Sequence, residues 1–487
     1  MKRNYSFIGF VLLFFAFGTN NSSPLSAKQS LEDQKKMAET WVDGNRDQLI
    51  EISDQLWDFA ETALKEYKSA DLLVNTLREA GFDVERGVAE MPTAFVASYG
   101  KGKPVIGILA EYDALPGLSQ KVTTQKELLV EGGPGHGCGH NLFGTASVGA
   151  ALAVKEVMVK YNLQGTIKCF GCPAEETLVG KAYMAQEGLF DDLSSAIAWH
   201  PSSDTTQVNT GSSLAMNNFK VSFYGRTAHA AADPWNGRSA LDAVELTNTG
   251  INFLREHIPA TARIHYVILN GGKAPNVVPD FAHAWYYVRD INRKNVEDIY
   301  GRVLNIIKGA SLMTGTEYKV EFITAVHSVL HNVTGSKIMH KNLQKVGPPK
   351  FTPEEIDFAK KIQEACGKET KGLSEEIKPF KLNPEQRGGS TDVAEVSRIT
   401  PTVQLRVSCT PLDIPWHSWA VVASSGYTIG HKGMLVATKV MALTVLDFLN
   451  NPKLLEKMRQ EFIETTKGKK YITPLPEGQK LVLPEKY

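Results

Sequence analysis

The stretch Val105-Ile106-Gly107-Ile108-Leu109-Ala110-Glu111-Tyr112-Asp113 decides the fold expected for this chain, because it joins an apolar run directly to two carboxylates. A short, continuous apolar run of this kind predicts a buried strand. Glu111 and Asp113 then stand at its carboxyl end, on alternate residues and therefore on one face.

Helices and strands alternate on both sides of this stretch. Apolar residues have helical spacing from 31 to 80, and the pattern predicts further helices at 144–161, 181–188 and 434–449 and further strands at 94–99, 166–172, 195–199 and 402–407. This alternation predicts an α/β domain around a mostly parallel sheet. In such sheets the functional residues collect just beyond the carboxyl ends of the strands.

A second unit interrupts this domain. Its expected elements are a strand at 218–224, a helix at 240–257, strands at 265–270 and 283–288, a helix at 295–309 and a strand at 318–324. The order β-α-β-β-α-β is typical of a ferredoxin-like α+β fold. We therefore expect residues 212–325 to form a domain inserted into a larger one made of 28–211 and 326–487.

Composition and the first residues bound the function. The 487 residues contain 53 basic and 53 acidic side chains, which gives no electrostatic case for nucleic acid or an anionic membrane and favours a small substrate. Lys2 and Arg3 precede an apolar run at 7–17 and a polar, small-residue stretch at 19–28. This order predicts a signal peptide over 1–27 and an exported protein, periplasmic or secreted, without a membrane anchor after cleavage.

The five cysteines do not indicate a disulfide framework. Cys169 and Cys172 lie three residues apart in an expected strand, so their Cα atoms are about 10 Å apart, beyond the ~7 Å limit for a disulfide. We interpret both as packing residues. Cys138 is different, because it lies beside His140 in the glycine-rich stretch Gly135-His136-Gly137-Cys138-Gly139-His140-Asn141.

Four places in the chain offer metal ligands. They are Cys138 with His140, Glu175 with Glu176, His200, and a C-terminal histidine that is either His417 or His431. Thiolate, imidazole and carboxylate together suit divalent ions that polarise a carbonyl and activate water. Adjacent glutamates suit such a site because one can bind metal while the other moves protons as a general base.

Several motifs, taken in order, carry a resemblance to a known family. They are Glu111-Tyr112-Asp113-Ala114-Leu115-Pro116, Cys138-Gly139-His140-Asn141, Pro173-Ala174-Glu175-Glu176, His200, Gly225-Arg226-Thr227-Ala228-His229-Ala230-Ala231 and Gly271-Gly272-Lys273-Ala274-Pro275-Asn276-Val277-Val278-Pro279. Together they resemble the aminoacylase/carboxypeptidase family of dinuclear metallohydrolases, in its amidohydrolase branch that uses Cys-Gly-His. The resemblance covers nearly the whole chain after the expected signal peptide.

The resemblance implies a zinc-peptidase-like catalytic domain with two divalent metal ions per subunit, Zn²⁺ or Mn²⁺. The implied ligands are Cys138, whose thiolate can bridge both ions, with His140, Glu176, His200 and His417. His431 remains the alternative to His417. Glu175 matches the general base, and Asp113 matches a carboxylate that orients the ligands from behind.

The resemblance also implies a role for the inserted domain as a dimerisation or lid domain, and hence a homodimer. His229 and Asn276 match groups that stabilise the oxyanion, the histidine often acting in the partner subunit's active site. Arg289 suits either a substrate carboxylate, as a bidentate donor, or a structural ion pair.

The expected reaction is hydrolysis of the amide bond of an N-acyl or N-aroyl amino acid or a small dipeptide. Two alternatives are a catalytically silent protein that binds such compounds and a metal-free thiol hydrolase using Cys138 and His140. Retention of Glu175 beside Glu176 disfavours the first, since binding needs no base. Two positions depart from the family pattern: Asn141 stands where the branch usually has aspartate, and Cys172-Pro173-Ala174 replaces Gln-Pro-x before the glutamates. Neither departure removes a ligand.

Overall fold

The computed structural model describes residues 24–177, 179–204, 206–382, 388–481 and 483. The apolar run of the expected signal peptide, at 7–17, lies outside the described residues. The end of that expected peptide overlaps the first turn of helix α1 (Pro24–Gly44).

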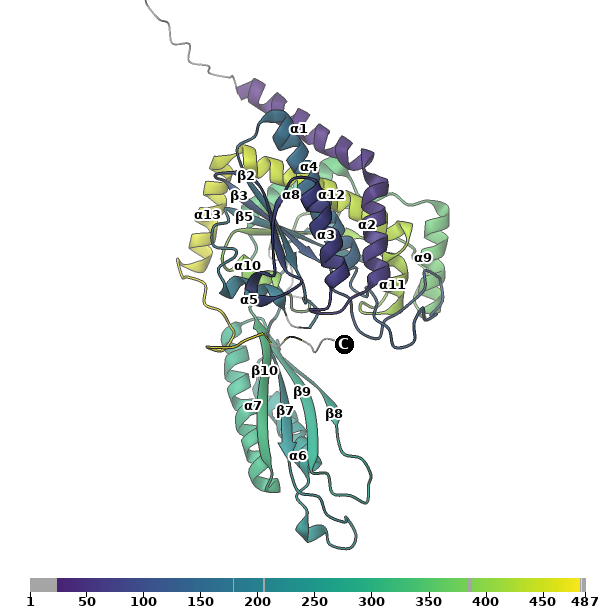
Figure 1. The fold of residues 1–487 in the computed structure, drawn as a ribbon, viewed down its shortest axis with the longest axis vertical. Helices are drawn as coiled ribbons and strands as arrows, with labels where there is room; N and C mark the ends of the chain where they lie inside the picture. Colours follow the sequence, from purple (N-terminus) through teal and green to yellow (C-terminus); the bar gives the residue numbers. More distant parts are fainter. Residues whose placement is uncertain (1–23, 178, 205, 383–387, 482, 484–487) are drawn as a thin grey trace, which may run out of the picture.

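A seven-stranded sheet forms the centre of the larger domain (Figure 1), in the order β1-β2-β4-β3-β5-β11-β6. The strands are β1 (Asp83–Arg86), β2 (Phe95–Lys101), β3 (Val105–Glu111), β4 (Gly165–Cys172), β5 (Ser195–Ser202), β6 (Gln207–Asn209) and β11 (Thr402–Ser408). The neighbours β4, β3, β5 and β11 are parallel, whereas β1 and β2 on one side and β6 on the other are antiparallel. The sheet is therefore mixed, with a parallel centre.

Two long helices, α4 (His140–Tyr161) and α12 (Thr428–Asn450), pack against each other and against β5. Both are long and apolar enough to cross a bilayer, but 83% and 72% of their most apolar windows are buried in the protein, so they are core helices. The other helices of this domain are α2 (Arg46–Phe59), α3 (Tyr67–Glu79), α5 (Gly180–Gln186), α8 (Val333–Val346), α9 (Pro353–Ala365), α10 (Val393–Ser397), α11 (Trp419–Ser425) and α13 (Pro452–Thr466). Short 3-10 turns lie at Val88–Glu90, Pro234–Asn236 and Arg255–His257.

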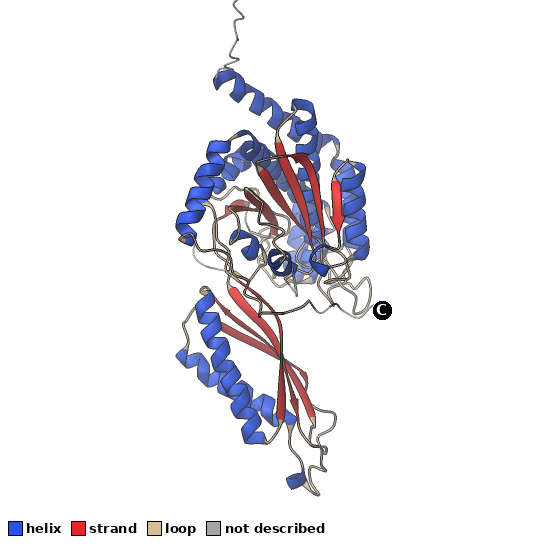
Figure 2. Ribbon diagram, turned by 60° about the vertical axis from the view of Figure 1, so that its left-hand side comes forward, coloured by secondary structure: helices blue, strands red, loops and turns tan. Residues whose placement is uncertain are grey.

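The inserted domain extends away from the larger one as an arm (Figures 1 and 2). It contains β7 (Ala215–Tyr224), α6 (Ala240–Leu254), β8 (Arg263–Asn270), β9 (Phe281–Asp290), α7 (Arg293–Thr314) and β10 (Glu317–Val326). Its antiparallel sheet has the order β10-β7-β9-β8, which confirms the ferredoxin-like expectation. The chain enters through β7 and leaves through β10, so the ten residues of β7 separate the far tip from the larger domain by about 30 Å.

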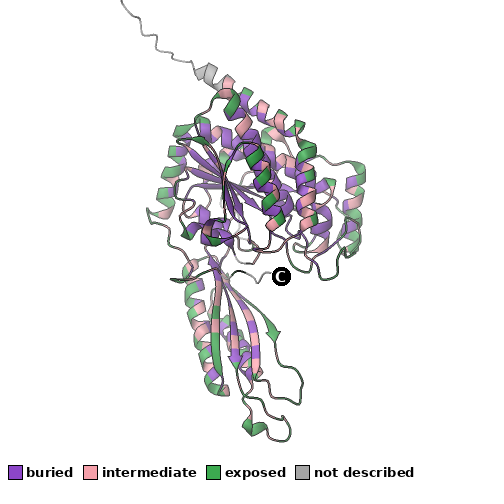
Figure 3. Ribbon diagram, in the orientation of Figure 1, coloured by how far each residue is buried: buried purple, intermediate pink, exposed green. Residues whose placement is uncertain are grey.

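Burial distinguishes the two sheets (Figure 3). Every residue of β3 is buried, as its apolar sequence predicts, whereas β8 at the edge of the inserted sheet is mostly exposed. The carboxyl ends of the parallel strands in the larger domain meet at one edge of the sheet. β3 ends at Glu111, β4 ends shortly before Glu175, β5 carries His200, and a loop runs from β11 to His417.

Candidate active site

The Cys-Gly-His loop leads directly into α4. Gly139 adopts a left-handed backbone with φ 71°, and a Cβ built there would lie 3.0 Å from Pro201 Cγ, so this position favours glycine. The helix begins at His140 rather than at the expected Gly144, which places His140 and Asn141 in its first buried turn. The tight turn therefore directs Cys138 and His140 towards the same space.

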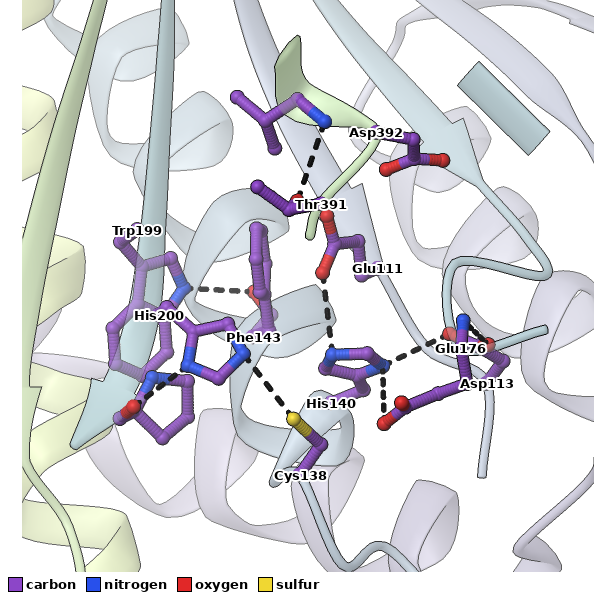
Figure 4. A network of polar contacts seen from close by, with 12 residues as sticks. Glu111, Asp113, Cys138, His140, Phe143, Glu176, Trp199, His200, Thr391 and Asp392 are labelled. Carbon is purple, nitrogen blue, oxygen red and sulfur yellow. Dashed lines mark hydrogen bonds and ion pairs between the residues drawn. The ribbon is translucent and has the colours of Figure 1, made fainter. Parts of the chain in front are cut away.

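Cys138, His140 and His200 form the first group of possible metal ligands (Figure 4). One donor atom from each lies within 4.8 Å of the others, and Cys138 Sγ is 3.3 Å from His200 Nε2. His200 Nδ1 donates to the carbonyl of Pro201 at 2.7 Å, which leaves Nε2 free. Burial and the charge of His140 lower the pKa of His200 to about 3, so its ring is neutral and able to bind metal.

A second group consists of Cys138, Glu176 and His417, whose donor atoms also lie within 4.8 Å of one another. Glu176 Oε2 is 3.5 Å from His417 Nε2, and Glu176 Oε1 is buried without a hydrogen-bond partner among the described residues. The backbone N–H of His417 donates to Gly137 at 3.1 Å, which ties it to the Cys-Gly-His loop. Because both groups share Cys138, its thiolate can bridge two ions.

The donor set fits divalent metal ions. Sulfur, imidazole nitrogen and carboxylate oxygen are the ligands of zinc sites, and manganese accepts the carboxylates readily. The orphaned buried atoms point the same way, since His140 Nε2 has no hydrogen-bond partner among the described residues either. The residues present therefore fit the metals that the sequence implies.

Asp113 holds two of these ligands at once. Its Oδ1 is 2.9 Å from His140 Nδ1, and its Oδ2 accepts the backbone N–H of Glu176 at 2.9 Å. The contact to Nδ1 leaves Nε2 of His140 as the metal-binding nitrogen. This geometry suits the orienting role predicted for Asp113.

Glu175 lies beside the two groups without belonging to either. A carboxylate oxygen of Glu175 is within 4.8 Å of a ring nitrogen of His140 and a carboxylate oxygen of Glu111. Burial, followed by the charges of Glu111 and Glu176, raises the pKa of Glu175 well above its usual range. A carboxylate with a raised pKa accepts a proton readily, as a general base must.

Burial argues against a metal-free thiol mechanism. Desolvation and the charge of Glu176 raise the pKa of the Cys138 thiol well above its usual value. A neutral thiol is a poor nucleophile, whereas metal coordination supplies the deprotonation that makes cysteine a ligand. Cys169 and Cys172, in contrast, are free and buried in the core, as expected.

Some supporting residues were missed by sequence reasoning. Glu66 is fully buried, and its Oε1 accepts the N–H of Ala174 at 2.9 Å, which holds the left-handed turn before the two glutamates at φ 61°. Lys181 and Asp392 form a buried ion pair with Nζ–Oδ1 2.6 Å close to Glu111. Each is an isolated charged residue with no motif around it, so only the folded structure identifies it.

The alternative last ligand, His431, lies elsewhere. It is on α12, and its Nε2 is 2.8 Å from Asp54 Oδ1. The helix begins at Thr428, not at the expected Met434, so His431 belongs to it and not to the loop after β11. The structure therefore brings His417, not His431, to the candidate site.

His229 and Asn276 lie at the far tip of the inserted domain. Both are exposed, and the carbonyl of Asn276 accepts the N–H of Ala230 at 3.0 Å. His229 Nδ1 accepts two backbone N–H groups of its own turn. The ten-residue strand β7 keeps this tip about 30 Å from the larger domain of the same chain. Within a single protomer the two residues are therefore not part of the site.

Asn141 now has a structural explanation. Its buried Nδ2 donates to the carbonyl of Ser425 at 3.0 Å and to Ser53 Oγ at 3.1 Å. An aspartate would place a carboxylate oxygen against the carbonyl of Ser425, and a buried acceptor facing another acceptor is unfavourable. The departure from the family pattern therefore links α4 to α2 and α11 and leaves the ligands in place.

A cavity of about 240 Å³ opens beside His417. Its lining includes Leu118, Leu128 and Trp419, which are apolar, and Lys126. A cavity that shares a wall with a ligand of the candidate metal centre is a suitable place for part of a small substrate.

Comparisons with known proteins agree with this site. Residues 215–312 match the peptidase dimerisation domain of M20 proteins. The chain is 41% identical to one of the two kinds of subunit of the p-aminobenzoyl-glutamate hydrolase of Escherichia coli (strain K12), over 90% of this chain and 96% of that protein. It is 28% identical to the Xaa-Arg dipeptidase of Mus musculus, over 90% and 94% of the two chains. The fold is shared with a dinuclear metal binding peptidase of the M20 family from Bacillus subtilis, with TM-score 0.56 and 17% identity over 84% of this chain and 99% of that one.

Proposed function

Since the chain belongs to the M20 peptidase family, we propose that it is a dinuclear metal-dependent amidohydrolase of N-acyl or N-aroyl amino acids or small dipeptides. The observation that carries this proposal is the pair of ligand groups that share Cys138. The relatives act on the same kind of bond, being hydrolases of aminobenzoyl-glutamate and of Xaa-Arg dipeptides. The alternative of a catalytically silent binding protein has less support, because Glu175 stands free beside the ligands.

The chain's own residues divide the chemistry between them. Divalent ions bound at this site would polarise the amide carbonyl and lower the pKa of water. Asp113 fixes the orientation of His140 and of the Glu176 backbone. Glu175 takes the proton from the attacking water and later delivers it to the leaving amine. His229 and Asn276, supplied by a second copy of the chain, would donate hydrogen bonds to the oxyanion.

Two ions per subunit, as zinc or manganese, complete the proposal. Cys138 and the histidines favour zinc, whereas Glu176 is compatible with manganese. Elemental analysis of the purified protein is expected to give two equivalents of one of these metals. A value near zero after loading with either metal would contradict a dinuclear site.

Arg289 is proposed to bind the substrate carboxylate. It lies at the end of β9 nearest the larger domain, and its Nε is buried without a hydrogen-bond partner among the described residues. Burial lowers the pKa of His417, and the charges of His140 and Arg289 lower it further, which places the guanidinium close to the metal ligands. A charged donor at this position suits the carboxylate of an N-acyl amino acid.

Arg289→Met is expected to raise KM for N-acyl amino acids by about 10- to 100-fold, because one charge-assisted contact of about 1.5–3 kcal/mol is lost. A panel containing p-aminobenzoyl-glutamate, N-acetyl amino acids and dipeptides would measure the effect. The control is a substrate whose free carboxylate is converted to an amide, which the variant and the parent should hydrolyse equally. An unchanged KM for every carboxylate substrate would assign Arg289 a structural role.

The second copy is proposed to dock along β8. Four consecutive residues of this edge strand, Tyr266, Val267, Ile268 and Leu269, are 39–51% exposed. An exposed apolar edge strand is a template for pairing with another chain. The match to a peptidase dimerisation domain covers the same strand.

Ile268→Lys is therefore expected to convert a homodimer into monomers, because a lysine on the edge opposes pairing. Light scattering coupled to gel filtration would measure the mass. Leu312→Lys, on the exposed surface of α7, is the matched control and should remain dimeric. The monomer is also expected to lose most activity, since His229 can no longer reach a partner's site; a fully active monomer would contradict this assignment.

We also propose that the protein is exported to the periplasm or secreted. The basic, apolar and small-residue order of residues 1–27 supports this. Fractionation of cells that express the full chain or a chain lacking 1–27 tests it. Export of the full chain alone is the expected result, and equal retention of both inside the cell would refute the proposal.

A further inference from the structure

The geometry points to Glu111 as an additional protein ligand of the metal ion that His140 binds. Sequence reasoning assigned this residue no task, and the two groups of ligands described above do not include it. The inference rests on the proposed metal-dependent function and extends the donor set on one side of the site.

The first argument is the position of one carboxylate oxygen. Glu111 Oε2 lies 3.2 Å from His140 Nε2 (Figure 4). With metal–ligand bonds of about 2.0–2.1 Å, two donors on one tetrahedral or octahedral ion lie about 2.9–3.4 Å apart. The observed separation is therefore that of two ligands of the same ion.

The second argument is the free valence of the imidazole. His140 is completely buried, and its Nδ1 is already engaged by Asp113 at 2.9 Å. Its Nε2 has no hydrogen-bond partner among the described residues, although Glu111 Oε2 is within reach, so the two atoms are not aligned for a hydrogen bond. Both are aimed at common space, where a cation would satisfy them together.

The third argument is the clamp on the other oxygen. Lys181 Nζ is 2.6 Å from Glu111 Oε1 and 2.6 Å from Asp392 Oδ1. Asp392 Oδ2 also accepts the backbone N–H of Lys181 at 2.9 Å, and all three side chains are at most 1% exposed. The clamp fixes Oε1, so only Oε2 is available to bind an ion.

The charges of this cluster agree with a bound cation. One ammonium, that of Lys181, contacts two carboxylates, so the buried trio carries one excess negative charge. Asp113 and Glu175 add further acidic groups on the side of His140. Burying uncompensated negative charge is costly, and a divalent ion between Glu111 and His140 would offset it.

The test is a Co²⁺ titration of the metal-free full chain and its Glu111→Gln variant, followed by equilibrium dialysis and visible absorption. The variant leaves Lys181 paired with Asp392. We expect the parent to bind two ions and the variant to bind one of them about 10- to 100-fold more weakly. We also expect the cobalt d–d bands to change because the coordination changes, while the thiolate-to-cobalt band from Cys138 persists.

Glu395→Gln is the matched control, because Glu395 is an equally buried carboxylate that contacts His327 and Tyr471 away from the site. It should bind both ions with the parent's affinity. Should Glu111→Gln fail to fold, Glu111→Asp keeps the charge for Lys181 but shortens the reach, and it should show the same weakened ion. Parent-like affinity and spectrum in the folded variant would make the contact a structural ion pair and overturn the inference. Failure of the parent itself to bind metal would instead overturn the proposed function.

Discussion

Replacement of Glu175 by glutamine is expected to lower kcat by about 10²- to 10⁴-fold, the contribution of a positioned general base. Glutamine has nearly the same shape as glutamate but cannot accept the proton of the attacking water. Because Glu175 belongs to neither group that shares Cys138, both metal ions should remain bound. Steady-state kinetics together with elemental analysis measures the two properties separately.

The neighbouring residue provides the contrast. Glu176→Gln removes an oxygen that lies 3.5 Å from His417 Nε2, so this variant should lose metal as well as activity. Adjacent glutamates would then differ in metal content although both are inactive. Turnover of Glu175→Gln at the parent's rate would rule out the mechanism proposed above.

Cys138→Ala is expected to abolish both metal binding and activity, since Cys138 is the one residue common to the two ligand groups. No other single substitution among the proposed ligands should lower the content of both ions. Elemental analysis after dialysis and an activity assay with added metal measure the loss. Cys172→Ala is the control, because this cysteine is buried in the core and forms no part of either group, and it should retain both properties.

Chelation separates this explanation from a thiol hydrolase, which would also be inactivated by Cys138→Ala. Treatment with a strong chelator should remove activity, and zinc or manganese should restore it. The thiol alternative predicts the opposite, namely that activity survives complete removal of metal. The burial that keeps the Cys138 thiol protonated favours the metal-dependent outcome.

The sequence predicted those parts of the fold whose signal is local. β3, β4, β5 and β11 are short apolar runs and were all expected, as was the order of elements in the inserted domain. The expectation of a mostly parallel sheet was only partly right, because β1 and β6 have four and three residues and give no pattern. The direction of β2 depends on its pairing with β4, about seventy positions away, which local spacing cannot encode.

The candidate site divides in the same way. Motifs identified Cys138, His140 and the glutamate pair, because glycine and adjacent acids mark these segments in the sequence itself. Lys181 and Asp392, in contrast, are 211 positions apart and meet only because α5 and α10 pack together. Long-range contacts of this kind decide which isolated charges belong to a site.

The left-handed backbone around the glutamates and at the last ligand has a cost for the whole chain. Ala174, Val179 and His417 have φ values of 61°, 53° and 54°, although none is glycine. Each such residue costs about 1–2 kcal/mol, and the total is a sizeable fraction of the 5–15 kcal/mol that holds a typical domain folded. Thermostability and catalysis therefore compete at these turns, and substitutions that relax them would make a sturdier protein but a poorer catalyst.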